Sequence, residues 1–200
     1  MNIRRSTQED LQDVAAVHRA SILGLCARHY SVVQLSQWTD ALRPEGYAVL
    51  LASREFLVAE QDGELLGFGV LDLSESLVNA TYVSPKAVRR GVGRRLLEAM
   101  ETIARQQGAT RLQLSSTLNA VPFYQSLGYL QQGAGTNRLP TGVELPCILM
   151  TKDLVGERRA APQSHSSECG PGGSVASSRA PGRRHGDRAM AQQVRRATQR

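Results

Sequence analysis

The segment from Leu77 to Gly108 constrains the fold more than any other part of this sequence, because a strand, a glycine-containing turn and a helix follow one another directly. Leu77 to Val83 is rich in residues that suit a pleated surface. Pro85 cannot donate a ladder hydrogen bond, so the strand ends at or before it. From Val92 onward, apolar residues recur at helical spacing until Gly108 supplies a stop. The sequence therefore predicts a strand, a turn and an amphipathic helix in succession.

The turn between the strand and the helix favours an anion. A helix begins with several backbone N–H groups that have no intrahelical partner, and its dipole places roughly half a positive charge there. Gly91 and Gly93 have no side chains, so a phosphate group can approach that backbone closely. Four arginines add positive charge around the same point: Arg89, Arg90, Arg94 and Arg95. The sequence predicts a phosphate or pyrophosphate ligand here; a surface turn with a solvated basic face is the alternative.

The motif around this turn excludes two common phosphate loops. No Gly-Lys-Ser/Thr follows a glycine and four variable residues, so a P-loop is excluded. The dinucleotide fingerprint needs three glycines, and this turn has two. The turn instead resembles the acyl-CoA loop of the GNAT (Gcn5-related N-acetyltransferase) superfamily, which reads Val-x-Pro and then Arg/Gln-x-x-Gly-x-Gly/Ala. The residues that fit this pattern in register are Val83, Pro85, Gly91 and Gly93.

Val88 departs from the family pattern, which usually has Arg or Gln at this position. One side-chain contact to the phosphate is therefore missing from the expected set, and Arg89 and Arg90 are the candidates to replace it. The backbone N–H groups of the turn do not depend on side-chain identity. The resemblance implies acetyl-CoA as co-substrate, held by residues of the turn and of the strand before it: Tyr82, Val83, Arg89, Arg90, Gly91, Val92, Gly93 and Arg94.

A second motif lies about one strand beyond the helix, where the GNAT superfamily places it. The stretch from Asn119 to Tyr129 (NAVPFYQSLGY) resembles the family's downstream signature, Asn-x-x-(x)-x-x-Phe-Tyr-x-x-x-Gly-Phe/Tyr. The resemblance implies that Tyr124 is the general acid for the leaving CoA thiolate. Asn119 is expected to bind the pantetheine arm, to cap the helix, or both. The alternative for Tyr124 is an aromatic side chain that only packs within its helix.

The fold class implied by the resemblance is α/β, of the mixed α+β kind. The expected GNAT acyl-CoA N-acyltransferase fold has a central, mostly antiparallel mixed sheet flanked by helices. That sheet is splayed between the strand ending at Val83 and the strand near Leu112–Ser115, which should run parallel through a right-handed crossover. A bulge near Thr81-Tyr82 is expected to turn an N–H toward the thioester carbonyl.

Local patterns in the first half of the chain predict further elements. Asp62-Gly63 lies between Phe56–Glu60 and Leu65–Leu73, and Asp-Gly between apolar runs indicates a hairpin. With Leu77–Val83 these runs form an antiparallel meander. Met1 to Arg5 reads as a first strand.

The helical segments of the first half carry their own local signals. Ser6 with Glu9 fits a helix capping box, with Thr7 and Asp10 as the alternative. His18 falls on the apolar face of the helix that follows, which favours a packed histidine. The breakers Pro44 and Gly46 come before a short helix predicted over Tyr47–Ala52.

The last part of the folded region reads as two strands. They are predicted over Tyr129–Gln131 and Glu144–Thr151, and the loop Gly133–Arg138 between them is expected to vary with substrate. Dimers are common in the superfamily that this sequence resembles, and the final strands are the expected interface of a homodimer.

Three residues are candidates for contacts to the acceptor amine, because the first pair of helices borders the acceptor pocket in the GNAT fold. They are His29, Tyr30 and Trp38, and a small core beside a loop histidine is the alternative. The family fixes no single residue as the base that removes the amine proton. Glu75 and Asp72 are the best carboxylates by position, and His29 is the best imidazole.

The positive charge of the chain is confined to its last part. Residues 1–154 hold 15 Lys and Arg against 15 Asp and Glu, whereas residues 155–200 hold nine Arg against three acidic residues and so carry the whole +6. That stretch is rich in Gly, Pro, Ser and Arg, and it has too few large apolar residues to offset its ordering entropy. The sequence predicts a GNAT domain over 1–154 and a disordered tail over 155–200, with a helical tendency from Arg188 to Arg196. Loose nucleic-acid binding by the tail is an alternative to a passive role, and none is expected of the folded domain.

Cysteines and apolar runs exclude several other classes. The three cysteines are too scattered for a disulfide framework or a zinc site, and no metal is expected. Without a membrane span or a signal core, a cytoplasmic protein is predicted. The function predicted is transfer of an acetyl group from acetyl-CoA to a primary amine of a small molecule. The alternatives are acetylation of a protein N-terminus or lysine, and a non-catalytic module that binds CoA or nucleic acid.

Overall fold

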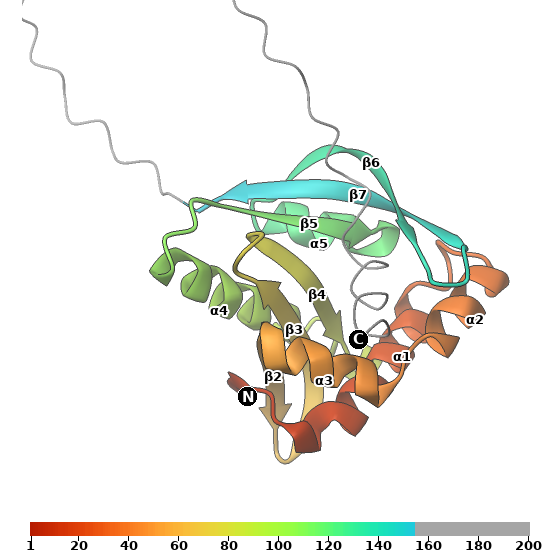
Figure 1. The fold of residues 1–200 in the computed structure, drawn as a ribbon, viewed down its shortest axis with the longest axis horizontal. Helices are drawn as coiled ribbons and strands as arrows, with labels where there is room; N and C mark the ends of the chain where they lie inside the picture. Colours follow the sequence, from red (N-terminus) through yellow and green to blue (C-terminus); the bar gives the residue numbers. More distant parts are fainter. Residues whose placement is uncertain (155–200) are drawn as a thin grey trace, which may run out of the picture.

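A computed structural model describes residues 1–154, apart from the side chain of Pro44. These residues form a seven-stranded sheet in the order β1-β2-β3-β4-β5-β7-β6, with helices packed on it (Figure 1). The strands are β1 (Asn2–Arg5), β2 (Glu55–Gln61), β3 (Glu64–Asp72), β4 (Leu77–Val83), β5 (Arg111–Thr117), β6 (Leu130–Arg138) and β7 (Glu144–Asp153). The helices are α1 (Leu11–Leu25), α2 (Val32–Asp40), α3 (Pro44–Ser53), α4 (Val92–Gln106) and α5 (Val121–Ser126), with 3-10 turns η1 (Gln8–Asp10), η2 (Pro85–Ala87) and η3 (Leu118–Ala120).

The strand pairing confirms the predicted fold class. Neighbouring strands of the described sheet are antiparallel except β4 and β5, which pair in parallel around α4. β2, β3 and β4 form the predicted meander. Asp62 and Gly63 both have positive φ, 54° and 77°, as a two-residue type I′ hairpin turn requires.

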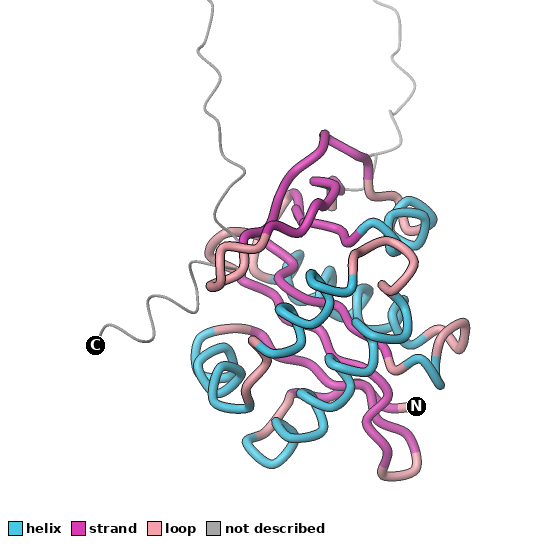
Figure 2. The backbone as a smooth tube through the Cα atoms, turned by 90° about the vertical axis from the view of Figure 1, so that its right-hand side faces the viewer, coloured by secondary structure: helices cyan, strands magenta, loops and turns pink. Residues whose placement is uncertain are grey.

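Two apolar cores lie on opposite faces of the sheet. α4 covers one face and buries its predicted stripe of Val92, Leu96, Leu97 and Met100 (Figure 1). α1 and α3 cover the other face, and Figure 2 shows the helices beside the layer of strands. Each fully buried Leu of the stripe contributes roughly 1.5–3 kcal/mol to folding. The packing of α4 therefore holds the turn at its N-terminus against the sheet.

Near the N-terminus the alternative capping box of Thr7 and Asp10 forms in place of Ser6 with Glu9, and the predicted break at Pro44 and Gly46 was wrong. The capping box uses Thr7, whose N–H donates to the Asp10 carboxylate at 2.7 Å, because Arg4 holds that carboxylate in place from the first strand at 2.7 Å. Pro44 does not break the chain but begins α3, since the first helical position needs no N–H donor. Gly46 lies within the same helix.

The prediction of a loop over Gly133–Arg138 was also wrong, because these residues belong to β6. β6 pairs with β7 along its length, with Gly135 opposite Cys147. A Cβ at Gly135 would lie 2.9 Å from a Leu149 methyl carbon, so glycine lets the two strands pack closely. Tertiary packing therefore makes a strand from a glycine-rich segment.

Some predictions concern residues that the structure does not describe. The tail 155–200, its helical segment Arg188–Arg196 and Cys169 lie outside the described residues, so the division at residue 154 stays a prediction. Among residues 1–154, none of the helices has the length and apolar character needed to cross a membrane.

Candidate functional site

The central feature of the site is the divergence of β4 from β5, which Figure 1 shows as two strands that separate along their length. They pair only at Leu77 with Gln113 and at Val78 with Leu114. β5 then pairs with β7 alone, while β4 continues to Val83. We call the space between the diverging parts the β4–β5 wedge. An extended ligand with amide groups can bond to a strand edge of this kind.

The backbone of β4 presents alternate residues to the wedge. Ser84 N–H donates to Leu66 O at 2.8 Å, on the β3 side. By the alternation of an antiparallel ladder, the backbone N–H of Tyr82 also points toward β3. The N–H groups of Thr81 and Val83 point the other way, toward the wedge. The backbone contact to the cofactor that was predicted for Tyr82 is thus better assigned to Thr81 and Val83. The Tyr82 side chain lies in the core, with its ring centroid 3.8 Å from that of His18.

The bulge of β4 lies earlier than predicted. Val70 pairs with Ala80 and Leu71 with Val78, so Asn79, rather than Thr81-Tyr82, is the extra residue. Asn79 is also the first residue past the last β4–β5 pair, so the bulge and the divergence coincide. The two polar side-chain atoms of Asn79 and the Thr81 hydroxyl are buried and have no hydrogen-bond partner among residues 1–154. Such groups cost about 1–3 kcal/mol each when left unpaired, which favours a polar ligand here.

The turn after β4 has the features predicted for an anion site. Gly91 has φ 79°, and Arg89 has φ 62°. The first bond of the helix runs from Arg95 N–H to Gly91 O at 3.0 Å, so the N–H groups of Val92, Gly93 and Arg94 precede the helical ladder. These N–H groups can therefore bind a phosphate.

The two glycines of the turn serve different purposes. A Cβ at Gly91 would meet no atom of the described residues within 4 Å, so glycine is required there for its backbone conformation. A Cβ at Gly93 would lie 3.1 Å from Cζ of Phe123, so this glycine lets α4 pack against α5. The arrangement brings the turn next to the helix that carries Tyr124.

The cationic side chains of the turn are only loosely held. Arg90 donates to Gln61 at 3.4 Å, and Arg94 lies 3.6 Å from Glu98. Arg89 makes no ion pair within the described part of the chain. Val88, at the position of the family's Arg or Gln, is 40% exposed. These guanidinium groups are exposed, so they can reach an anion bound at the turn.

Tyr124 is buried at the wedge. Its ring packs against Phe123 and Tyr129, with centroids 5.0 and 5.7 Å away. Burial raises the pKa of its phenol, and the nearby Thr81 hydroxyl of β4 lowers it in part. The two hydroxyls do not form a bond of full hydrogen-bond geometry. The phenol therefore keeps its proton at neutral pH, and it lies beside Thr81, whose backbone N–H points toward the wedge.

Two residues at the corner between α1 and α2 are attached to the segment that precedes α5. The Cys26 thiol donates to Asn119 Oδ1 at 3.3 Å. The Tyr30 hydroxyl accepts from Leu118 N–H at 3.1 Å and donates to Pro146 O at 2.8 Å. Burial raises the pKa of Cys26 to about 11 and that of Tyr30 to about 12, so both stay protonated. The bond from Cys26 to Asn119 spans 93 residues, so it carries no local signal in the sequence.

Two of the predicted acceptor residues come together with Tyr82. The ring of Trp38 lies 5.6 Å from that of Tyr30 and 6.4 Å from that of Tyr82, and all three residues are buried. His29 is exposed, and the described structure shows no ring contact between it and this cluster. The cluster is aromatic and uncharged.

Comparison with known proteins decides the family. A family model described as "Acetyltransferase (GNAT) domain" matches residues 26–145. The chain belongs to the GNAT family. It is accordingly an acyltransferase, and its family uses acetyl-CoA.

Individual relatives of this GNAT protein differ in their acceptors. The peptidyl-lysine N-acetyltransferase YiaC of Escherichia coli (strain K12) is 34% identical over 100 residues, which cover 48% of this chain and 64% of YiaC. An aminoglycoside N(6')-acetyltransferase type 1 of Stenotrophomonas maltophilia is 33% identical over 110 residues, covering 48% of this chain and 72% of that protein. The crystal structure of a GCN5-related N-acetyltransferase from Rhodopseudomonas palustris has a TM-score of 0.72 at 31% identity and covers 76% and 94% of the two chains.

The carboxylates predicted as bases of this GNAT protein lie apart from Tyr124. Asp72 is buried and pairs with Arg54 at 2.8 Å, so it is engaged in the fold. Glu75 is exposed in the turn before β4, at the end where β4 and β5 still pair. Sequence distance alone could not show that this end of β4 is the closed end of the wedge. Within residues 1–154, no group of three or more His, Cys, Asp or Glu is placed to hold a metal ion.

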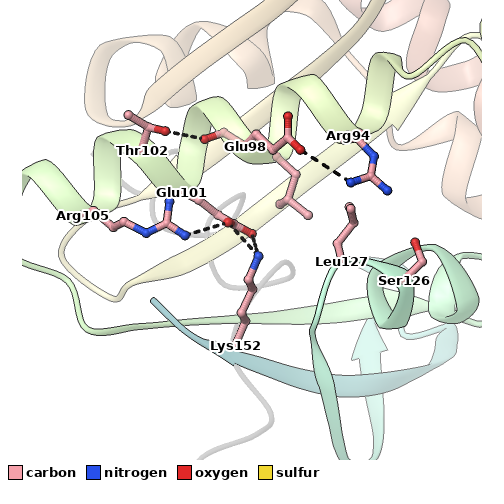
Figure 3. A pocket seen from close by; sticks show the side chains of 9 residues that line it. Arg94, Glu98, Glu101, Thr102, Arg105, Ser126, Leu127 and Lys152 are labelled. Atoms are coloured by element: carbon pink, nitrogen blue, oxygen red, sulfur yellow. Dashed lines mark hydrogen bonds and ion pairs between the residues drawn. The ribbon is translucent and has the colours of Figure 1, made fainter. Parts of the chain in front are cut away.

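A groove of about 440 Å³ lies between α4, α5 and β7 (Figure 3). Lys152 reaches from β7 to the Glu101 carboxylate at 2.7 Å, and Arg105 approaches it at 3.1 Å. Glu101 is 3% exposed, so this cluster joins β7 to α4. Of the predicted site residues, the groove contains only Arg94, and the acyl-transfer chemistry is better placed at the wedge.

Proposed function

We propose that this GNAT protein transfers an acetyl group from acetyl-CoA to a primary amine of a small, partly apolar molecule. The observation that carries the proposal is the convergence on one wedge of an open strand edge, a protonated phenol and the N-terminus of a helix. The strand edge is that of Thr81 and Val83, and the phenol is that of Tyr124.

The residues at the wedge fit acetyl-CoA by their donors and acceptors. The N–H groups of Val92 to Arg94, with the arginines of the turn, would hold the pyrophosphate. The edge of β4 and the Asn119 amide would bind the amides of the pantetheine arm. The unpaired polar atoms of Asn79 and Thr81 support a ligand of this kind.

The transfer step assigns distinct tasks to these residues. The amine nitrogen bonds to the acetyl carbon, the carbon–sulfur bond breaks, and its electron pair stays on sulfur. Wedge-facing N–H groups of β4 stabilise the charge that develops on the carbonyl oxygen. Tyr124 gives its hydroxyl proton to the sulfur and regains one from solvent. The ammonium loses one proton before attack and the new amide another, so one proton is released overall.

The acceptor class is inferred from the aromatic cluster. Tyr30, Trp38 and Tyr82 are buried in one apolar core, and an acceptor that reaches this core would meet uncharged rings, which suit an amine on an apolar group better than a polycation. Peptidyl lysine is the second candidate, because YiaC carries that activity in its name. A cytoplasmic site of action and a homodimer through β6 and β7 remain part of the proposal.

The first test is titration of acetyl-CoA into the full chain and into Gly91→Asp and Gly91→Asn. Both side chains tolerate positive φ and enter open space, and they differ only in charge. We expect the Asn variant to bind within a few-fold of the unmutated protein and the Asp variant to lose at least about tenfold. Equal binding by both variants would contradict a pyrophosphate site at the turn.

The second test is catalytic. Free thiol released from acetyl-CoA is measured with a panel of apolar monoamines, an aminoglycoside and a lysine peptide, for the unmutated chain and for Tyr124→Phe. We expect a loss in kcat of about 10²-fold or more for Phe, with acetyl-CoA binding unchanged. An unchanged kcat would remove Tyr124 from the mechanism, and a clear preference for the lysine peptide would select the second acceptor class.

A further inference from the structure

We propose that Cys26 is a positioning residue for the cofactor arm. Its thiol donates a hydrogen bond to the side-chain carbonyl of Asn119, and this leaves the side-chain NH2 group of Asn119 as the donor presented to the pantetheine arm. The inference rests on the proposed function, because it assumes that Asn119 faces bound CoA. Cys26 precedes Asn119 by 93 residues, so the inference adds a residue that is distant in the sequence to that site.

Both partners of this contact are held by the fold. Cys26 follows α1, its N–H donates to Ile22 O at 3.0 Å, and its carbonyl accepts from His29 N–H at 2.9 Å. Its side chain is buried, with the residue 2% exposed. On the other side, the Tyr30 hydroxyl accepts from the N–H of Leu118, next to Asn119, at 3.1 Å. The 3.3 Å thiol–amide contact thus joins two anchored segments that are 93 residues apart.

The chemistry of the pair sets the direction of the hydrogen bond. The thiol is kept protonated by its surroundings, so it acts as a donor, and a carbonyl oxygen is a far better acceptor for it than an amide NH2. The Asn119 side chain is therefore turned with its oxygen toward Cys26. Its two N–H donors point elsewhere, and Asn119 is partly exposed. Carbonyl groups of the pantetheine arm are acceptors of the matching kind.

The alternative is that Cys26 only fills space in the core. Cys147 is a matched control, because it is the other buried cysteine of the described residues and is equally little exposed, at 2%. It lies on β7, opposite Thr117 and Gly135. A packing role would make the two cysteines behave alike, whereas a positioning role would set Cys26 apart.

The experiment measures two ligands with four full-length proteins: unmutated, Cys26→Ala, Cys26→Ser and Cys147→Ala. The ligands are CoA and 3′-phosphoadenosine 5′-diphosphate, which keeps the diphosphate but lacks the pantetheine arm. We expect Cys26→Ala to weaken CoA about three- to tenfold, the range for one neutral hydrogen bond, and to leave the fragment unchanged. Cys26→Ser should recover part of the loss, and Cys147→Ala should bind both ligands normally.

A spectroscopic readout supports the binding data without ligand. The side-chain NH2 resonances of Asn119, assigned through the Asn119→Asp variant, should shift in Cys26→Ala and stay in place in Cys147→Ala. The inference is overturned if Cys26→Ala binds CoA normally, loses both ligands equally or leaves these resonances unmoved. If Cys26→Ala does not fold, Cys26→Val, which also lacks a donor, takes its place, and resonances and a CoA affinity equal to those of Cys147→Ala would likewise overturn the inference.

The failure of this inference differs from a failure of the proposed function. If the unmutated chain binds CoA and Gly91→Asp removes that binding while Cys26→Ala has no effect, the function stands and the role of Cys26 falls. If the unmutated chain binds neither ligand, the proposed function falls and takes the role of Cys26 with it.

Discussion

Lowering the pH below about 6.5 should destabilise this protein through His18, which is buried between α1 and the sheet. The residue is 5% exposed, its Nδ1 lies 2.7 Å from the Tyr47 hydroxyl, and its Nε2 has no hydrogen-bond partner in the described part of the chain. The rings of Phe68 and Tyr82 pack against it, with centroids 5.4 and 3.8 Å away. Burial raises the pKa of both Tyr47 and Tyr82, so neither phenol offers a negative charge to an imidazolium.

The magnitude follows from the pKa of His18. Burial lowers this pKa from 6.5 to about 3, so below pH 6.5 the unfolded chain binds a proton that the folded chain excludes. The stability contributed by neutral His18 is complete above pH 6.5 and falls toward pH 3, by about 1.4 kcal/mol per pH unit. Between pH 6.5 and pH 5 the loss is about 2 kcal/mol. The carboxyl of Asp10, with a pKa of about 2, contributes only at lower pH.

The assay is urea unfolding of the unmutated chain and of His18→Asn at several values between about pH 5 and 7.5. Asn can still hydrogen bond to Tyr47 but does not titrate in this range. We expect the free energy of unfolding of the unmutated chain to fall with pH at the slope given above, and that of the variant to stay nearly flat. Parallel slopes for the two proteins would refute the reasoning, because they would assign the pH dependence to other groups.

Two further predictions concern stability and come with controls from the same structure. Glu101→Gln should lower the free energy of unfolding in urea by about 3 kcal/mol, because it leaves Lys152 without its buried carboxylate. Glu98→Gln, on the exposed face of the same helix, should lower it by less than about 0.5 kcal/mol. Equal effects would contradict a structural role for the cluster in Figure 3. Gly67→Ala should lower the melting temperature, since its Cβ would lie 2.7 Å from the Tyr82 carbonyl oxygen. Gly46→Ala should raise the melting temperature slightly and add about 0.5–1 kcal/mol of stability, because that helix position has open space. A Gly67→Ala variant as stable as the unmutated chain would show that β3 and β4 can move apart there.

The sequence alone determined the features that depend on neighbouring residues. The end of β4 before Pro85, the Asp62-Gly63 hairpin and the start of α4 after Gly91 follow from local sterics and from the 3.6-residue and two-residue periods of apolar side chains. The same short-range patterns carried the family resemblance, since both motifs are continuous stretches of chain. These features therefore require no tertiary contact to be predicted.

Only the tertiary structure decided how distant segments meet. The bulge falls at Asn79, where β4 leaves β5, because strand pairing is settled across the whole sheet and not within one strand. The glycine-rich stretch that reads as a loop becomes β6 because β7 lies beside it. The contact of Cys26 with Asn119 spans 93 residues, and that of Tyr30 with Pro146 spans 116. No local pattern encodes such pairs, because the free energy that forms them comes from packing the two faces of the sheet, which exist only once the chain has folded.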